Sequence, residues 1–299
     1  MKRFLKRAVI ALVLVLVLCT TGLAIAVVVR ENRTFDAPYP AIHATTDQAA
    51  IERGRYLVMG PEHCISCHGD AQGELTGGVE FHLPVGTVRS PNLTPDHETG
   101  IGRYRDDELA RVLRHGVHPS GRAMLPFMPF ADLADSDLVA VISYLRSRPA
   151  VRHEVAASDF NLLGRFAKAF LLEPKGPTRP VRATVTPAPT AAYGEYLVST
   201  VANCAGCHTQ RSLRTGEPTG PILGGGMELE SHTSPGTKFV TPDLRPGGHL
   251  AQWNEEAFVR RFQHGVATAS PMPWETFARM TEDDLRAIYR YLQTLPPAK

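Results

Sequence analysis

Two pentapeptides hold the residues best able to do chemistry in this chain. They are Cys64-Ile65-Ser66-Cys67-His68 and, 140 residues later, Cys204-Ala205-Gly206-Cys207-His208. Two thiols one helical turn apart can each form a thioether to one haem vinyl group, and the following histidine is then held against the iron. The pattern predicts two covalently bound haem c groups, with thioethers at Cys64, Cys67, Cys204 and Cys207 and axial ligands at His68 and His208.

Three other uses of paired cysteines fit less well. A thioredoxin-like redox pair has no use for the histidine. A zinc site built from both pairs would need them much closer together in the chain than they are here. A disulfide framework would not place a histidine at the same position after each pair.

A second axial ligand is expected from a methionine, which raises the reduction potential of a haem. Two methionines stand in matching contexts, Met128-Pro129-Phe130 and Met272-Pro273-Trp274. Each is followed by an apolar residue five positions later, Leu133 and Phe277. We therefore predict Met128 and Met272 as the second ligands, with Met124 as the alternative to Met128.

The two pentapeptides belong to an internal repeat, which fixes the domain organisation. Four further segments recur in order: Gly54-Arg55-Tyr56-Leu57-Val58 with Gly194-Glu195-Tyr196-Leu197-Val198, Gly77-Gly78-Val79-Glu80 with Gly225-Gly226-Met227-Glu228, Pro91-Asn92-Leu93 with Pro242-Asp243-Leu244, and His115-Gly116 with His264-Gly265. The chain therefore reads as one module used twice. We expect one domain at 31–150, a linker at 151–190 and a second domain at 191–299.

Each module is expected to be mainly helical, which gives an all-α fold class. In the first module Asp47 can cap a helix to Met59, Gly116 can end a helix over 106–114, and apolar periodicity predicts a last helix over 137–148. In the second module the corresponding helices cover 192–201, 254–264 and a segment opened by Thr281-Glu282-Asp283-Asp284, an Asp variant of the capping box.

The linker combines an amphipathic helix with a semi-rigid proline-rich spacer. Its apolar residues are Phe160, Leu162, Leu163, Phe166, Phe170 and Leu171, and five prolines follow between 174 and 189. The apolar face is expected to pack on one of the modules. The alternative is a docking surface for a partner subunit or for a membrane.

The amino-terminal segment has the composition of a membrane helix. Its uncharged run from Ala8 to Val29 is 22 residues long and follows four basic residues, Lys2, Arg3, Lys6 and Arg7. This charge bias places the amino end in the cytoplasm. We expect residues 1–30 to be an anchor or uncleaved signal in a bacterial inner (plasma) membrane, single-pass, with both haem domains periplasmic. Ala24-Ile25-Ala26 fits a signal-peptidase site, so cleavage after residue 26 is the alternative.

These motifs resemble those of class I cytochromes c. The run Ser90-Pro91-Asn92-Leu93-Thr94-Pro95-Asp96, with Met128-Pro129-Phe130 beyond it, is similar to the cytochrome c subunits of membrane-bound bacterial alcohol and gluconate dehydrogenases. The resemblance covers nearly the whole chain after the anchor and implies tandem class I cytochrome c domains. Those subunits typically carry three haems, whereas this chain has two attachment motifs.

The resemblance also implies roles for several other residues. The first helix of each domain should cross the last through a glycine against an aromatic, as Gly54 with Tyr144 and Gly194 with Tyr291. Pro221 stands in the segment that should supply a carbonyl to the proximal histidine, with Gly73 in its place in the first module. Tyr104 and Trp253 occupy the position of a haem-propionate donor.

Together these features predict an electron-transfer protein rather than an enzyme. Electrons would pass between a periplasmic dehydrogenase and another cytochrome, a quinone pool or an oxidase. Two other functions stay open, a dihaem peroxidase-type enzyme and a cytochrome subunit of a haem-copper oxidase. The chain of 299 residues has room for an anchor and two domains, and its net charge of +2 does not favour nucleic-acid binding.

Overall fold

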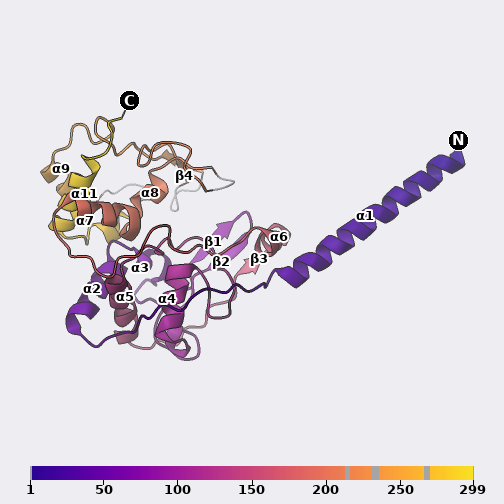
Figure 1. The fold of residues 1–299 in the computed structure, drawn as a ribbon, viewed down its shortest axis with the longest axis horizontal. Helices are drawn as coiled ribbons and strands as arrows, with labels where there is room; N and C mark the ends of the chain where they lie inside the picture. The colour runs from indigo at the N-terminus through magenta and orange to yellow at the C-terminus, as the bar shows by residue number, and fades with distance from the viewer. Residues whose placement is uncertain (1, 213–215, 231–235, 266–269, 299) are drawn as a thin grey trace.

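A computed structural model of the chain describes residues 2–212, 216–230, 236–265 and 270–298. Helix α1 (Lys2–Arg30) projects alone from two packed domains (Figure 1). Its 29 residues are long and apolar enough to cross a membrane, and only 6% of its most apolar window is buried. A buried contact does occur at its inner end, where Val27 is 4% exposed.

The first domain contains the following elements: α2 (Gln48–Met59), α3 (Cys64–His68), β1 (Glu80–Leu83), β2 (Gly86–Arg89), η1 (Ile101–Arg103), α4 (Asp106–His115) and α5 (Asp135–Ser147). The predicted caps are present, since Asp47 accepts the Ala50 N–H and Gly116 ends α4 with φ 63°. Helix α5 begins two residues earlier than predicted. Arg114 binds the Asp135 carboxylate at 2.7 Å and holds this first turn in place.

The second domain repeats this order of elements. They are α7 (Ala191–Tyr196), a π-helical turn η2 (Leu197–Val201), α8 (Cys204–Cys207), β4 (Glu228–Glu230), β5 (Lys238–Val240), α9 (Glu255–Gln263), α10 (Trp274–Phe277) and α11 (Glu282–Leu292). The predicted cap Thr281 accepts the Asp284 N–H, and Asn254, predicted as the first residue of its helix, is instead its cap and accepts the Ala257 N–H. The hydrophobic core of the two domains is continuous through their contact.

Both domains cross their first and last long helices through a glycine, as predicted. A Cβ at Gly54 would overlap the Ala140 carbonyl oxygen and lie 2.8 Å from the Tyr144 Cβ. A Cβ at Gly194 would overlap the Ala287 carbonyl oxygen and lie 2.9 Å from the Tyr291 Cβ. The glycines therefore allow the two helix backbones to touch, and these crossings position the attachment motif that follows each first helix.

Short strands lie in the Gly-rich stretches between the motif and the middle helix. Strands β1 and β2 form an antiparallel hairpin that β3 (Asp159–Phe160) extends, and β4 pairs with β5. A mainly helical structure is compatible with the predicted all-α class. The sequence did not indicate these hairpins because the strands are only three or four residues long, too short for apolar alternation to distinguish them from loop.

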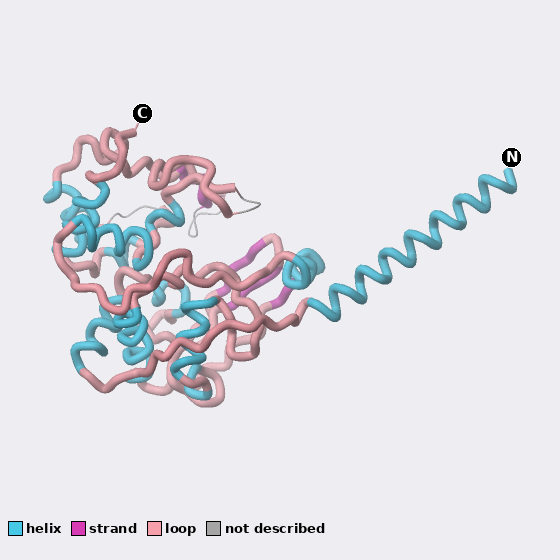
Figure 2. Tube along the Cα trace, viewed as in Figure 1, coloured by secondary structure: helices cyan, strands magenta, loops and turns pink. Residues whose placement is uncertain are grey.

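The linker contains β3, then a helix, and continues as extended chain. Asn161 accepts the Gly164 N–H and caps α6 (Leu162–Phe170), which lies beside the inner end of α1 (Figure 1). Figure 2 shows the long loop that runs from α6 to the second domain. The Asp135 and Ser136 N–H groups bind the carbonyls of Arg182 and Ala183, so this loop is tied to the start of α5.

The glycine crossings give the first testable prediction. Gly54→Ala or Gly194→Ala forces a methyl group into a backbone contact, so each should lower the free energy of unfolding by about 3 kcal/mol. Chemical denaturation followed by circular dichroism measures this. Gly220→Ala is the matched control, because its added methyl group would face only the flexible Gln210 side chain. If all three variants lost the same free energy of unfolding, the glycines would not be needed for close packing of the helices.

Candidate functional site

The two pentapeptides form short helices entered in the same unusual way. His63 and Asn203 precede the first cysteine of α3 and α8, and both have left-handed backbone angles, with φ 43° and 48°. No disulfide joins the two cysteines of either pair. One helical turn separates the thiols in each pair, as the predicted double attachment requires.

Each motif histidine is oriented by a carbonyl from a distant loop. The Nδ1 atom of His68 lies 2.9 Å from the Pro91 carbonyl oxygen, and that of His208 lies 3.0 Å from the Pro242 carbonyl oxygen. Because a carbonyl only accepts, Nδ1 carries the proton and Nε2 keeps its lone pair for a metal. Burial lowers the pKa of both histidines, which favours the neutral form that can ligate.

Paired glycines hold these loops over the histidines. The Gly77 N–H binds the His68 carbonyl oxygen at 2.9 Å, and the Gly225 N–H binds that of His208 at 2.8 Å. The N–H groups of Gly78 and Gly226 donate to the carbonyl oxygens of Ser90 and Thr241, the residues just before Pro91 and Pro242. All four glycines have positive φ, between 68° and 89°. Sequence reasoning found these glycines as a repeat but missed their role.

The expectation that Pro221 supplies the histidine carbonyl is wrong. Pro242 supplies it, and the Pro221 carbonyl instead accepts the Gly224 N–H in an exposed turn. Gly73 likewise lies in a surface turn, with its N–H on the Asp70 carbonyl. The true acceptors lie 23 and 34 residues beyond the histidines. The recurrence of Pro91 and Pro242 was the available signal.

Met128 and Met272 take equivalent places in the two domains. Both are partly buried against the hydrophobic core. Met124 instead lies in a segment held to Gly116, whose carbonyl accepts its N–H at 2.7 Å. Tyr104 and Trp253 also pack against the core. Iron ligation by the methionines and a propionate contact by the two aromatic residues stay predictions.

The residues present fit two haem c groups. Each domain offers a thiol pair and an imidazole whose Nε2 atom is available as a ligand. The Trp274 Nε1 atom, two residues after Met272, is buried and has no acceptor within the described ranges, so a donor remains for a bound group. No cluster of three or more His, Cys, Asp or Glu side chains occurs among the residues described.

A duplicated hydrogen-bond pattern joins the two domains. The Tyr56 hydroxyl donates to Asp284 Oδ2 at 2.6 Å and accepts the Thr281 N–H at 3.2 Å. In the mirrored contact, Tyr196 donates to Asp137 Oδ2 at 2.8 Å and accepts the Ala134 N–H at 3.0 Å. Each tyrosine thus caps the last helix of the other domain. We call these four side chains the tyrosine clamp: Tyr56, Asp137, Tyr196 and Asp284.

The clamp also explains why the expected capping box at Thr281 is incomplete. The Thr281 hydroxyl does accept the Asp284 N–H. The Asp284 carboxylate, however, accepts a hydrogen bond from the Tyr56 hydroxyl and not from the Thr281 N–H. Arg53 adds an asymmetric ion pair, with Nε 2.9 Å from Asp137 Oδ1. Burial opposes the charge of Arg53, but the hydrogen bond and charge of Asp137 raise the pKa of Arg53 overall.

Glu62 is a buried carboxyl at this contact. Its side chain is 2% exposed, and Oε1 has no hydrogen-bond partner in the part of the chain that is described. Burial, with a smaller effect of the Asp137 charge, raises the pKa of Glu62 to about 8. Its Oε2 atom lies 3.8 Å from the Cys64 sulfur, which loses its proton once a thioether forms. The geometry therefore favours a neutral Glu62.

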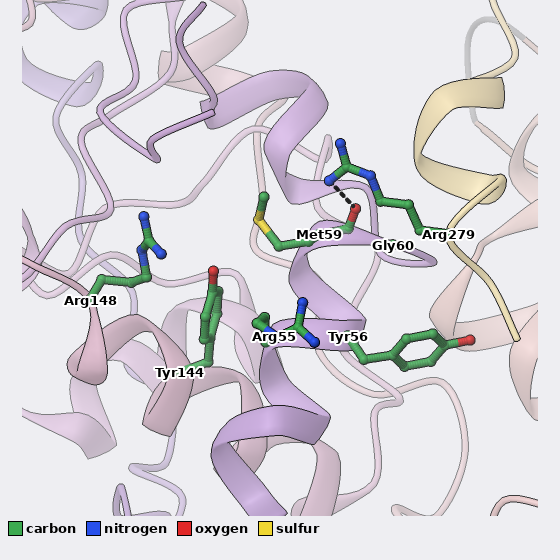
Figure 3. Close-up of a pocket in the computed structure, with 7 residues that line it drawn as sticks. All are labelled: Arg55, Tyr56, Met59, Gly60, Tyr144, Arg148 and Arg279. Atoms are coloured by element: carbon green, nitrogen blue, oxygen red, sulfur yellow. Dashed lines mark hydrogen bonds between the residues drawn. The ribbon is translucent and has the colours of Figure 1, made fainter. Parts of the chain in front are cut away.

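A cavity of about 480 Å³ lies at the domain boundary, apart from the motif residues (Figure 3). Its lining residues are Arg55, Tyr56, Met59, Gly60, Tyr144, Arg148 and Arg279. Figure 3 shows Arg279 of the second domain reaching the Met59 carbonyl oxygen, at 3.2 Å. None of the predicted haem-binding residues lines this cavity, so we assign it no part in haem binding.

Comparisons with known proteins point to the same chemistry. Residues 49–145 match the family model described as cytochrome c oxidase, cbb3-type, subunit III, and residues 191–296 match the cytochrome c family model. The chain is 32% identical over 273 residues to the cytochrome c subunit of the quinone alcohol dehydrogenase of Komagataeibacter europaeus, covering 84% of this chain and 57% of that relative. It thus spans little more than half the length of that relative.

Two further relatives cover similar parts of the chain. The gluconate 2-dehydrogenase cytochrome c subunit of Pantoea cypripedii is 31% identical over 269 residues, covering 83% of this chain and 60% of the relative. A diheme cytochrome c-type protein of Cereibacter sphaeroides is 28% identical over 256 residues, covering 78% of this chain and 82% of the relative.

The tyrosine clamp predicts a specific stability loss. Tyr56→Phe or Tyr196→Phe removes one hydroxyl that serves both a buried carboxylate and a helix N-terminus, so each should lower the free energy of unfolding by about 2 kcal/mol. Denaturant titration of the haem-loaded protein measures this. Tyr39→Phe is the control, because its half-exposed hydroxyl accepts a longer hydrogen bond, from Arg111 at 3.3 Å, and its loss should cost less. A Tyr56→Phe variant as stable as this control would rule out the clamp.

Glu62 predicts a pH dependence with a definite sign. The folded chain keeps the proton up to about pH 8, whereas the unfolded chain releases it near the ordinary value of 4.5. Stability should therefore fall as pH rises between these values, by about 1.4 kcal/mol per pH unit at most. Glu62→Gln should flatten this slope and the exposed Glu275→Gln should not. Denaturation curves from pH 5 to pH 8 test this, and an unchanged slope in Glu62→Gln would contradict it.

Proposed function

We propose that the protein is a two-haem electron-transfer protein, because both of its domains belong to the cytochrome c family. The observation that carries this proposal is the duplicated histidine site, in which His68 and His208 are each fixed by a proline carbonyl. An identical arrangement in both domains fits two equivalent groups. The diheme relative supports the same number.

The residues divide into three roles. The cysteine pairs attach the two groups covalently, through Cys64, Cys67, Cys204 and Cys207. His68 and His208 would each supply one ligand to an iron, and Met128 and Met272 would supply the second. When bound, each haem accepts and releases a single electron. The chain sets the reduction potentials through these ligands, through burial and through the proline carbonyls that polarise the histidines.

The partner we propose is a periplasmic dehydrogenase, with another cytochrome, a quinone pool or an oxidase at the other end of the transfer. Relatives named as cytochrome subunits of alcohol and gluconate dehydrogenases align with more than four fifths of this chain. Such subunits transfer electrons beside a catalytic subunit, which fits a chain with two haem sites and no assigned catalytic residue.

One observation favours a second candidate. Residues 49–145 match a model described as subunit III of a cbb3-type oxidase. A cytochrome subunit of a haem-copper oxidase would also carry anchored haem domains. Isolation of the tagged full chain from membranes separates the two, because a dehydrogenase or an oxidase would co-purify. The dehydrogenase is the expected result, since those relatives align across both domains.

We further propose that α1 is a retained membrane anchor, with both domains on the periplasmic side. Four basic residues precede its apolar run, which favours a cytoplasmic amino end. Glu31, the residue after α1, is held to the first domain, because Arg165 binds its carboxylate through two hydrogen bonds, so the apolar helix leaves the fold from a fixed point.

The proposed ligand set predicts a spectroscopic result. The oxidised protein should show a sulfur-to-iron charge-transfer band and no high-spin signal, because both irons have two axial ligands. Met128→Ala and Met272→Ala should each remove part of the band, and the double variant should remove all of it. Met124→Ala is the control and should leave the band unchanged. Loss of the band in Met124→Ala, or a high-spin iron in the native protein, would contradict this ligand set.

A further inference from the structure

Helix α6 is fastened to the point where α1 meets the first domain. The Arg30 guanidinium lies over the Phe170 ring, 5.4 Å from its centre, and Arg33 donates to the Leu172 carbonyl oxygen at 2.6 Å. Arg165 and Glu31 form an ion pair at 2.6 Å. These contacts hold α6 beside the inner end of the apolar helix, as Figure 1 shows.

One side of α6 packs inward and another stays exposed. A Cβ at the buried Gly164 would overlap the Val85 carbonyl oxygen, and Ala169 is fully buried, so this side rests on the β1–β2 hairpin and on α1. In contrast Leu162, Leu163 and Leu171 are 76%, 57% and 69% exposed. The sequence expectation that the apolar face packs on a module is thus only partly met.

The charges around α6 suit a bilayer surface. Arg165 and Arg33 pair with Glu31 and Glu173, whereas Arg30 and Lys168 form no ion pair among the residues described, and the Lys168 ammonium lies over the Phe160 ring at 4.7 Å. Helices that lie in a membrane interface combine exposed leucine and phenylalanine with flanking cations, which meet lipid headgroups. Nine residues at 1.5 Å each span about 14 Å, so every exposed leucine lies close to the end of α1.

We propose that α6 lies in the headgroup region of the same bilayer that α1 crosses, as a second contact between the first domain and the lipid. The inference rests on the proposed anchor, because that anchor places a bilayer next to Arg30. A lone helix would leave the domains free to swing. The second contact fixes which side of the first domain faces the lipid.

That side includes the segment leading to Met128. A hollow of about 220 Å³ runs beside α6, and Leu125 lines it together with Lys168 and Leu171. The loop that carries the proposed ligand of the first haem therefore lies on the lipid-facing side. The second domain has no part in this contact among the residues described.

Spin labels on the full, haem-loaded chain test the inference. Cys19 is the only cysteine outside the two motifs, so Cys19→Ser provides a background without a reactive thiol. Leu163→Cys places a label on α6, and Val240→Cys places the matched control on β5, where the native side chain is 68% exposed. Leu14→Cys reports on α1. Each variant is reconstituted in vesicles of phosphatidylcholine and phosphatidylglycerol, and power saturation measures collisions with oxygen and a nickel chelate.

The expected result is a Leu163→Cys label that meets oxygen readily and the nickel chelate several-fold less often than the Val240→Cys label. The Leu14→Cys label should be deeper still. A label at Leu163→Cys as open to nickel as the control, with Leu14→Cys deep, would overturn the inference and leave the anchor standing. Protection from both reagents would mean a protein contact and would also overturn it. Three labels open to nickel would defeat the proposed anchor as well.

Discussion

The hydrogen bond between each motif histidine and a proline carbonyl is the interaction on which this structure depends. It fixes the imidazole ring, puts the proton on Nδ1 and leaves Nε2 as a ligand. The cysteines can attach a haem without it, but only an oriented imidazole defines where the iron sits. The paired glycines and the hairpin that follows them position the proline carbonyl beside the histidine in each domain.

Hydrogen bonds between the two domains also hold the two histidine sites together. Tyr56 and Tyr196 each complete the helix N-terminus of the opposite domain, so neither last helix is fully capped in an isolated domain. A duplicated module accounts for this reciprocity, since equivalent residues meet across the contact. Arg53 breaks the symmetry, because its counterpart in the second domain is Tyr193. A fixed relation between the sites suits a protein that passes electrons between them.

What the sequence predicted was mostly local or repeated. The caps at Asp47 and Thr281 follow from neighbouring residues, and the crossing at Gly54 follows from the resemblance to class I cytochromes c. The acceptor of the histidine proton was missed because Pro91 reaches His68 only through tertiary folding. Asp284 was read as part of a capping box, and a tyrosine from the other domain took that bond. Such competition between a local and a distant partner is invisible in a single sequence.

The central claim is that this chain carries two covalently bound haems, one in each domain. Intact mass spectrometry of the protein, unfolded to remove non-covalent ligands, tests it most directly. The account predicts the mass of the polypeptide plus two haems, and a loss of one haem in a variant that lacks Cys204 and Cys207. A native protein with the mass of the bare polypeptide, or with a single haem, would contradict it.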